Sequence, residues 1–486
     1  MLRIGIAAIM FVALASTMAQ AQYRTWTDVS GKQIKAKFVR IYNGEVVLLS
    51  GPTVHRVNWE QLSPADQKWL RNHVPKVDEL LKPQANGPTA KPAQGNWLQW
   101  RGPSGKNIAP GPAVPTEWDE TKNILWRIPL QGRGHSSPII VGDHLYLTSA
   151  DEQEQITGVY AFDKQTGELL WQTPVTRGGF QTDVHAKNTH ATSTLASDGE
   201  KLFALFIENN QVKLVKLDLA GKILWQESVG QYMPQQYKFG YAPSPMLYQD
   251  LVLVASEYEQ GWLAAFSQAD GKEVWRIDRK STSYSTPIVA NINGKDQLLL
   301  SGQEKVAGFD PRTGQQRWEA PGTTMATCGT AVWEGNVVYA GGGYPHNPTQ
   351  TVAVKVGDQA EVLWTSHESC YEQSLLVHDG YVYLMNDKGI FACLNGTTGE
   401  EQWRKRLGGN VSSSPLLSGD NIFIANEKGK MFVLKANPEE YEPVAQNQLG
   451  DETFATPIVS DGKLYARYAD SSSGTRQEFL VCIGEK

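Results

Sequence analysis

Apolar and polar residues alternate along most of the chain in one recurring form, in which short apolar runs are separated by tight turns. The stretch Ala161-Phe-Asp-Lys-Gln-Thr-Gly-Glu-Leu-Leu-Trp171 shows the form most completely. A strand of apolar and small residues enters an Asp-x-x-Thr-Gly turn, and a second strand leaves it and ends in Trp. Gly supplies the positive φ that such a turn needs, so the stretch predicts a β-hairpin.

A Gly stands four residues before the Trp in each copy of this hairpin, at Gly167, Gly221, Gly271, Gly314 and Gly399. The fixed spacing places every indole at the same point of its strand, where it packs against a neighbouring unit in the same way each time. We therefore expect a structural docking role for seven tryptophans: Trp126, Trp171, Trp225, Trp275, Trp318, Trp364 and Trp403.

A second phrase, Ser or Thr followed by Pro and an apolar run, precedes each hairpin. It is clear at Ser137, Thr286, Ser414 and Thr456, and weaker copies start near Ser193, Ser244, Thr330 and Ser374. The two phrases together give four strands per unit, repeated at a spacing of about 45 residues. This pattern predicts an all-β fold, an eight-bladed β-propeller of four-stranded blades.

The two ends of the repeat region complete each other. Residues 123–129 read as an outermost strand without the three strands that should precede it, and the chain after Thr456 has three strands without a fourth. We expect 123–129 to pair with the final strand, because this pairing closes the ring and removes two exposed sheet edges.

The residues before the repeats divide into three parts. Residues 1–21 have the features of a signal peptide, with Arg3, an apolar stretch too short to span a membrane, and an Ala-x-Ala site ending at Ala21. Residues 22–74 predict a small SH3-like β-barrel domain with a short helix after Ser63, and 75–95 form a Pro- and Gly-rich linker. The propeller is then expected over 96–486.

Composition narrows the class of partner. The chain has 45 basic and 51 acidic residues, a net charge of −6, and no run of basic residues, which argues against nucleic acid as a partner. No stretch predicts a transmembrane segment, and no Cys precedes Cys328, so we expect an exported protein, periplasmic or secreted, that is not a lipoprotein. We expect the four cysteines to be buried as small apolar side chains, and a disulfide bridge between Cys328 and Cys370 is the alternative.

Candidate ligand groups lie where the chain enters each innermost strand, since propellers frequently bind partners at the mouth of the central channel. They vary from blade to blade. Asp183, His185 and His190 have ligand chemistry suited to a metal, but their spacing matches no known site, and we favour hydrogen-bonded loop histidines. Phe454 belongs to the same set of loop residues around the channel. The aromatic and histidine side chains of this set suit a peptide or glycan partner, and a channel that is merely plugged is the alternative. The predicted binding residues are His135, His185, Lys187, His190, Tyr241, Tyr284, Cys328, Tyr371 and Glu372.

Two parts of the chain resemble known families. The motif Ala-x-Asp-x-x-Thr-Gly-x-x-x-Trp, present at 161–171 and nearly intact at 308–318, resembles the bacterial PQQ-like propeller repeat, a family that includes quinoprotein alcohol dehydrogenases and the BamB propeller. The pattern from Trp26-Thr-Asp to Trp69-Leu70 resembles the first Sla homology domain. That resemblance implies an SH3-like fold and peptide or protein binding.

The enzymes of the propeller family hold a quinone and calcium, typically beside a disulfide between adjacent cysteines. This chain has no adjacent cysteine pair, and we match no residue to the calcium or catalytic positions. We therefore expect no catalytic residue, metal or cofactor. We predict a monomeric, non-catalytic scaffold of the cell envelope that binds proteins, peptides or glycans. The alternative is a quinoprotein alcohol dehydrogenase-like enzyme that uses pyrroloquinoline quinone and calcium.

Overall fold

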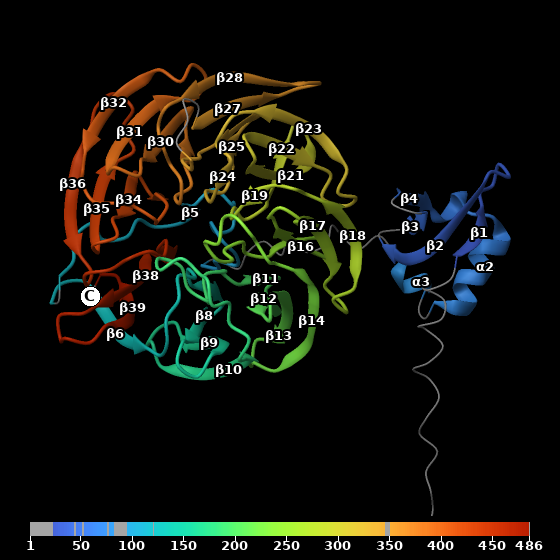
Figure 1. The fold of residues 1–486 in the computed structure, drawn as a ribbon, viewed down its shortest axis with the longest axis horizontal. Coiled ribbons are helices and arrows are strands. Elements are labelled where there is room, and N and C mark those ends of the chain that lie inside the picture. Colours follow the sequence, from blue (N-terminus) through green and yellow to red (C-terminus); the bar gives the residue numbers. More distant parts are fainter. Residues whose placement is uncertain are drawn as a thin grey trace, which may run out of the picture. The chain divides into compact units, whose positions relative to one another are not determined.

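The computed structural model describes residues 23–42, 45–50, 53–74, 77–81, 95–119, 121–345 and 350–485 (Figure 1). The chain separates into two compact units, residues 1–89 and 90–486. The predicted signal peptide and most of the predicted linker lie outside the described residues. None of the helices described is long and apolar enough to cross a membrane.

The first unit contains one antiparallel sheet with the strand order β1-β2-β3-β4 and three short helical segments. The strands are β1 (Tyr23–Thr27), β2 (Gln33–Tyr42), β3 (Glu45–Ser50) and β4 (Thr53–Asn58), and the helices are η1 (Trp59–Gln61), α2 (Pro64–His73) and α3 (Val77–Leu80). The Ser63 side chain accepts a hydrogen bond from the backbone N–H of Asp66, so the predicted start of α2 is confirmed. The SH3-like barrel and the likeness to the Sla homology domain stay predictions.

Helix α2 is fastened to β1 by a buried carboxylate. Asp66 lies 2.5 Å from Arg24 and accepts a hydrogen bond from the backbone N–H of Thr27. The Arg24 guanidinium in turn lies over the rings of Trp26 and Trp69, at 4.4 and 4.3 Å from their centroids. These contacts hold the helix against a small core that includes Trp26, Phe38 and Leu70.

The second unit is the predicted all-β propeller with eight four-stranded blades (Figure 1). The first four blades are β7 (Ile139–Val141), β8 (His144–Asp151), β9 (Ile156–Asp163), β10 (Leu169–Arg177); β11 (Ala196–Ser197), β12 (Lys201–Glu208), β13 (Gln211–Asp218), β14 (Ile223–Gln231); β15 (Met246–Tyr248), β16 (Leu251–Ser256), β17 (Trp262–Ser267), β18 (Glu273–Asp278); and β20 (Ile288–Ile292), β21 (Lys295–Gly302), β22 (Lys305–Phe309), β23 (Gln316–Pro321).

The other four blades complete the ring. They are β25 (Val332–Glu334), β26 (Val337–Ala340), β27 (Thr351–Val356), β28 (Ala360–Ser366); β29 (Leu376–His378), β30 (Tyr381–Met385), β31 (Ile390–Asn395), β32 (Glu401–Arg406); β33 (Leu416–Ser418), β34 (Asn421–Ala425), β35 (Lys430–Lys435), β36 (Pro443–Gln448); and β37 (Ile458–Ser460), β38 (Lys463–Asp470), β39 (Gln477–Ile483), β6 (Ile124–Leu130). Short parallel pairings add β5 (Ile108–Ala109) to β33, and join β19 (Thr282–Ser283) to β24 (Ala326–Thr327).

The last blade is built from both ends of the repeat region, as predicted. Strand β6 pairs antiparallel with β39, with Trp126 opposite Cys482. A buried ion pair reinforces this junction, because Arg467 lies 2.6 Å from Glu478 and both side chains are 2% exposed. Arg467 also donates to the carbonyl of Thr148 in the next blade, at 2.8 Å. The closing blade is therefore fixed to both the end and the beginning of the ring.

Adjacent blades dock through the repeated tryptophans. The indole N–H donates to a backbone carbonyl in the hairpin turn of the following blade. The donor and acceptor residues are Trp126 and Lys164, Trp171 and Leu219, Trp225 and Gln268, Trp275 and Pro311, Trp364 and Gly396, and Trp403 and Asn437.

The Gly of the hairpin turn lies directly against the indole of the preceding blade. A Cβ placed on Gly314 would come within 2.6 Å of Trp275, and a Cβ on Gly399 would come within 2.6 Å of Trp364. The φ angles of these glycines are 73° in both cases. The turn therefore requires Gly for its positive φ and for the close approach of the neighbouring indole.

Trp318 departs from this arrangement. Its indole N–H donates to the Gln297 side chain of its own blade, at 2.5 Å. The residue paired with Trp318 is Gly308, whose missing side chain leaves room for the ring, since a Cβ there would lie 2.3 Å from the indole nitrogen. The following blade has no Thr-Gly turn before Trp364 to receive the indole. Trp318 is therefore partly exposed, and its indole N–H bonds within its own blade.

Hydroxyl groups of the Ser/Thr phrase join the blades on the inside of the ring. The backbone N–H of the hydroxyl residue in one blade donates to the hydroxyl of the next blade at 2.9–3.0 Å. The pairs are Ser137 to Thr194, Thr194 to Ser244, Ser244 to Thr286, Thr330 to Ser374, Ser374 to Ser414, and Ser414 to Thr456. At the junction that closes the ring, the Ser137 hydroxyl donates to the carbonyl of Thr456. We call these eight residues the hydroxyl collar.

Residues 95–109 contact several blades along the inner strands and are called the crossing segment. Trp97 pairs with Ile140 of the first blade, and Trp100 donates to the Thr330 hydroxyl at 2.9 Å. Arg101 is 1% exposed and donates to the carbonyl of Leu375. Strand β5 then pairs with β33 of the seventh blade. This segment therefore ties together blades from opposite sides of the ring.

The four cysteines are free thiols. Cys370, Cys393 and Cys482 are buried and Cys328 is partly exposed. The alternative of a bridge between Cys328 and Cys370 is therefore not what the structure shows, and three of the four sulfurs pack as small apolar groups.

The closure of the ring predicts how truncation affects the propeller. A chain that starts at Gly95 should melt at nearly the temperature of the full chain, because it keeps the crossing segment and β6. A chain that starts at Pro110 loses the crossing segment and should melt lower. A chain that starts at Gly132 also loses β6 and should melt lowest or fail to fold, because β39 is left with an open edge. Equal melting temperatures for the Pro110 and Gly132 variants, measured by calorimetry, would contradict the closure.

The docking tryptophans predict a second, matched comparison. Trp275→Ala should cost about 3–5 kcal/mol of unfolding free energy, because a large ring is lost from between two blades. Trp318→Ala should cost less than half of that, because its ring is partly exposed and its indole N–H does not bond to the next blade. Urea unfolding of both variants measures the difference, and equal costs would show that contact between blades adds nothing to tryptophan burial.

Candidate functional site

A cavity of about 480 Å³ lies inside the ring, among the segments that lead into the innermost strands. Eight residues from the sequence-based prediction line it: His135, His185, Lys187, Tyr284, Cys328, Tyr371, Glu372 and Phe454. His190 and Tyr241 lie instead in a smaller neighbouring cavity of about 20 Å³. The structure therefore brings together most of the predicted residues, which come from six different loops.

One long loop supplies several of these groups. Residues 178–195 connect β10 to β11 and carry His185, Lys187 and Thr194 into the cavity. The loop is held in place by Asn188, whose side chain donates to the carbonyl of Phe239 at 2.7 Å. The floor of the cavity includes Trp100 of the crossing segment and members of the hydroxyl collar. Part of this same chain therefore lines the cavity, which agrees in part with the alternative of a plugged channel.

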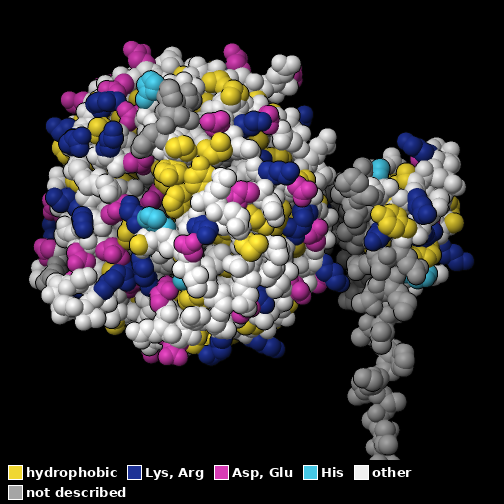
Figure 2. All heavy atoms as spheres, in the orientation of Figure 1, with side chains coloured by type: hydrophobic (Ala, Val, Ile, Leu, Met, Phe, Trp, Pro, Cys, Tyr) yellow, Lys and Arg dark blue, Asp and Glu magenta, His cyan; other side chains and the backbone are white. Residues whose placement is uncertain are grey.

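Four aromatic rings form one side of the cavity: Phe239, Tyr284, Tyr344 and Tyr371, called here the aromatic wall. The centroid of Phe239 lies 5.8 Å from Tyr284, 5.5 Å from Tyr344 and 6.3 Å from Tyr371. Tyr344 is 41% exposed. Figure 2 shows hydrophobic side chains gathered near the middle of this face of the ring. The wall therefore continues from the cavity to the surface.

The wall is held rigidly at its base. The Tyr284 hydroxyl donates to the carbonyl of Tyr237 at 2.5 Å, and the Tyr237 ring packs edge-on against Tyr344. Burial raises the pKa of Tyr284 and of Tyr371, so both phenols stay protonated at neutral pH. These rings therefore act as fixed apolar surfaces that carry neutral hydroxyls.

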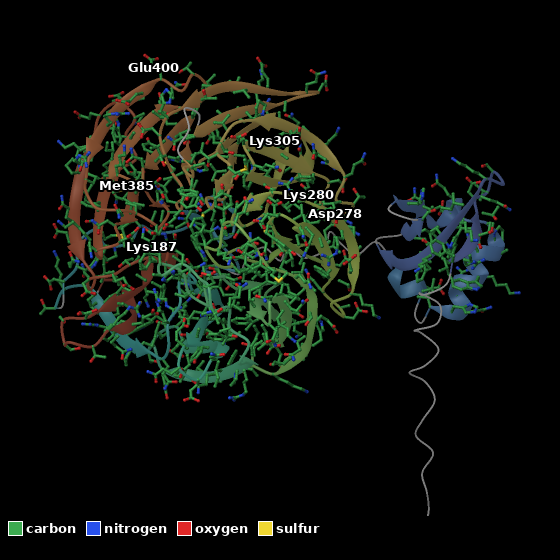
Figure 3. The ribbon with its side chains drawn as sticks, viewed as in Figure 1. Lys187, Asp278, Lys280, Lys305, Met385 and Glu400 are labelled. Carbon is green, nitrogen blue, oxygen red and sulfur yellow. The ribbon has the colours of Figure 1, made fainter. Side chains whose placement is uncertain are left out.

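A group of charges lies beside the wall. Lys187, labelled in Figure 3, lies 2.7 Å from Glu427 and 3.8 Å from Glu372. The Ser412 hydroxyl lies between the two glutamates: it donates to Glu372 and also lies 3.0 Å from a carboxylate oxygen of Glu427. Burial works against the charge of Lys187, but its hydrogen bond to Glu427 and the charge of Glu372 outweigh burial and raise its pKa.

Glu372 is held in an unfavourable environment for a carboxylate. Burial is the main cause that raises its pKa, and the negative charges of Glu427 and Asp387 add to the effect. Ser412 and Lys187 lower the pKa in part. The charge cluster therefore contains three carboxylates around one ammonium group, and Glu372 is the carboxylate that lines the cavity.

His135 faces the cavity from the other side. Its ring stacks on Phe454 with centroids 4.5 Å apart. Burial, with the positive charges of Arg133, Arg467 and Arg476, holds its pKa well below the ordinary value, so the ring is neutral at pH 7. Its Nε2 is buried and has no hydrogen-bond partner among the described residues. This nitrogen is therefore available to a ligand.

The possible metal ligands do not converge. His190 Nδ1 lies 2.9 Å from Glu152, and its Nε2 lies 3.1 Å from the carbonyl of Gln181. Asp183 pairs with Lys238 at 2.8 Å, while His185 packs edge-on against Phe239. Within the described parts of the chain, no three His, Cys, Asp or Glu side chains stand close enough to hold a metal ion. The interpretation of His190 as a hydrogen-bonded loop histidine agrees with this geometry.

The cavity does not suit pyrroloquinoline quinone, which carries three carboxylates. The cation that lines it, Lys187, is already neutralised by Glu427, and Glu372 would repel an anionic ligand.

Several lining residues were missed by the sequence prediction. Phe239 belongs to the long loop between β14 and β15, Tyr344 belongs to a loop within the fifth blade, Trp100 precedes the repeats, and Ser412 is one of three consecutive serines. Phe239 and Ser412 precede innermost strands, a position that would have identified them. Tyr344 lies between β26 and β27, and nothing in its spacing separates it from other loop residues.

Comparison with known proteins agrees with this architecture. The family model described as outer membrane protein assembly factor BamB matches residues 108–236, 157–405, 358–440 and 387–477. The serine/threonine-protein kinase AfsK of Streptomyces coelicolor is 23% identical over 331 residues, which cover 66% of this chain and 36% of the kinase. The chain thus spans about a third of the length of that relative.

Two solved structures share the fold. BamB from Moraxella catarrhalis superposes with a TM-score of 0.53 at 15% identity, over 75% of this chain and 97% of that one. The quinohemoprotein alcohol dehydrogenase from Comamonas testosteroni superposes with a TM-score of 0.58 at 12% identity, over 83% and 82%. At these identities the likeness establishes the fold alone. The family matches reach from residue 108 to residue 477, and the chain therefore belongs to the family described as outer membrane protein assembly factor BamB.

Proposed function

We propose that this protein is an exported, non-catalytic binding protein of the cell envelope, which holds a polypeptide segment of a partner at its central cavity. The name of the family model supports an envelope location and a protein partner. We further propose a monomer with domain limits at 22–74 and 96–486, in which the first unit provides a second recognition module.

The aromatic wall is the observation that carries this proposal. It combines a deep cavity, an exposed ring at Tyr344 and neutral hydroxyls, and such surfaces bind peptide side chains while hydrogen bonds orient the backbone. Its side chains lie outside the two contacts that repeat from blade to blade, the indole bonds and the hydroxyl collar. The wall is therefore not explained by these repeated docking contacts.

The chemistry of the cavity favours binding over catalysis. Cys328 lines it, but burial, with the nearby charge of Glu372, raises the pKa of the thiol well above its ordinary value. A protonated thiol is a poor nucleophile. The neutral His135 ring stacks on Phe454, whereas Cys328 lies with the aromatic wall, so no thiol–imidazole pair is formed by these two groups.

The burial of Glu372 adds a physical argument. A raised carboxylate pKa means that the folded state resists ionisation of this group more strongly than the unfolded state does. Its contribution to stability is therefore present below the ordinary glutamate pKa and is lost as the pH rises through the folded pKa. A residue that weakens the fold at neutral pH is more readily explained by ligand binding than by stability.

Glu372→Gln should accordingly melt higher than the unchanged protein at pH 7, and the difference should shrink at pH 4. Glu319→Gln is the matched control. The Glu319 carboxylate accepts from Lys305, which lowers its pKa, so its contribution is present at neutral pH and lost on acidification. The control should melt lower at pH 7, with the deficit shrinking at pH 4. Melting curves at the two pH values test both signs, and a Glu372→Gln variant that is less stable at pH 7 would contradict the argument.

Photo-crosslinking tests the proposed binding surface. A benzophenone amino acid at Tyr344 should crosslink a partner polypeptide in the envelope, because that ring lies at the exposed end of the wall. The same group at Leu170 is the control, since Leu170 is 43% exposed on an outer strand. Tyr371→Ala should reduce the crosslink at Tyr344. Equal crosslinking from Tyr344 and Leu170 would contradict a specific surface.

The purified protein can also be tested for the alternative function, a quinoprotein enzyme, which the fold similarity to the Comamonas dehydrogenase suggests. Quinone and calcium added together should leave the melting temperature unchanged. A true cofactor at one hundred times its dissociation constant would stabilise the protein by about 2.7 kcal/mol. A clear rise in melting temperature together with dye-linked alcohol oxidation would replace the binding proposal by the quinoprotein enzyme.

A further inference from the structure

We propose that the cavity recognises a cationic side chain of the partner, an arginine or a lysine, held between the aromatic wall and the Glu372 carboxylate. This inference rests on the proposed function and specifies the chemistry of its ligand.

The charge balance beside the wall is the first step. Glu427 occupies the Lys187 ammonium at 2.7 Å, whereas Glu372 Oε1 lies 3.8 Å from it, which is longer than a hydrogen bond. Asp387 accepts from the backbone N–H of Tyr371 at 2.9 Å, and its negative charge also acts on Glu372. Glu372 Oε2 accepts from the Ser412 hydroxyl, and Oε1 retains capacity to accept a hydrogen bond from a bound cation.

The positively charged groups on the opposite side of the cavity do not cancel the excess of negative charge beside the aromatic wall. Arg467 pairs with Glu478 at 2.6 Å and Arg476 pairs with Glu452 at 2.5 Å, so their charges are compensated locally. Arg133 lies beside His135 and donates to the carbonyl of Ala186 at 3.0 Å. The side of the cavity that contains Glu372 therefore remains negative, and an anionic ligand would be repelled there.

The aromatic wall supplies the second step. A cation within about 6 Å of the face of an aromatic ring is attracted by the electron density of that face. The chain uses this contact internally, because the Arg276 guanidinium lies 4.1 Å from the Trp262 centroid. In the described parts of the structure, the cation–ring contacts involve rings outside the wall. The wall and Glu372 together offer an incoming cation both an aromatic face and a carboxylate.

The neutral polar groups fit the rest of a peptide. His135 Nε2 is buried without a hydrogen-bond partner among the described residues. Buried polar atoms of this kind are usually satisfied by a partner. Backbone N–H and C=O groups beside the cationic side chain have the chemistry to satisfy them, which favours a polypeptide over a small free cation.

Ligand-observed NMR titration of the full mature chain tests the inference with matched peptides. The probes are the pentapeptide acetyl-Ala-Ala-Arg-Ala-Ala-amide, the same peptide with citrulline in place of arginine, and tetramethylammonium. Citrulline keeps the shape and removes the charge. The arginine peptide should bind about tenfold more tightly than the citrulline peptide, because both the carboxylate and the ring faces respond to charge.

Substitutions locate the effect. Glu372→Gln should bring the arginine peptide to within about twofold of the citrulline peptide, and Tyr344→Leu should weaken both the arginine peptide and tetramethylammonium. Glu319→Gln, on an outer strand, should change neither. Tyr344 is exposed, so its variant keeps the inference testable even if Glu372→Gln alters the fold.

Three results would overturn the inference: equal binding of the arginine and citrulline peptides, an arginine preference that survives Glu372→Gln, or binding of tetramethylammonium without binding of the arginine peptide. The first two, together with a specific crosslink at Tyr344, would leave the proposed peptide binding intact and remove only its preference for a cation. The third would indicate a small-cation site and would count against the proposed function as well.

Discussion

The propeller depends on one contact, an indole N–H of one blade donated to a turn carbonyl of the next. The contact works because the turn has a Gly where a side chain would strike the ring, as at Gly314 against Trp275. The hydroxyl collar repeats the principle on the inside, where a backbone N–H meets a Ser or Thr hydroxyl. Since both contacts use small and backbone groups, blades of different sequence dock in the same way at the six junctions that have the indole bond.

Because these docking contacts involve few loop residues, the other loop residues can carry function. The docking contacts use the hairpin turns on the outside and the hydroxyl residues two positions before each innermost strand on the inside. The loop residues before these hydroxyl residues supply His135, Glu372 and three rings of the aromatic wall, and Tyr344 comes from the loop between β26 and β27. The crossing segment joins distant blades and places Trp100 at the cavity, so ring stability and cavity shape are linked through it.

The sequence predicted the repeats well because the Gly-to-Trp spacing reports a contact that recurs in space. It also predicted the closure, because a single strand before the repeats and a missing strand after them have only each other as partners. Trp318 was grouped with the other tryptophans because spacing alone does not show which carbonyl an indole reaches. Gly308 stands where the repeats at 161 and 265 have Ala, and the next blade lacks the Thr-Gly turn. Only these two features taken together indicate that Trp318 is an exception.

The candidate site was less predictable. Residues before the innermost strands were identified by position, and most of them do reach the cavity. His190 and Tyr241 do not, because position in a loop does not determine the direction of a side chain. Glu427 follows β34 in a turn and meets Lys187 from another part of the ring, a pairing separated by 240 residues. Nothing in local sequence predicts a charge cluster of this kind.

Hydrogen–deuterium exchange of the full chain, alone and with its crosslinked or purified partner, tests most directly whether the central cavity binds the partner. Protection on binding should be concentrated in residues 183–192, 237–244 and 371–373, which surround the cavity, while the outer strands exchange as before. Protection confined to the outer strands, or to the first unit, would contradict the claim that the central cavity is where this propeller binds.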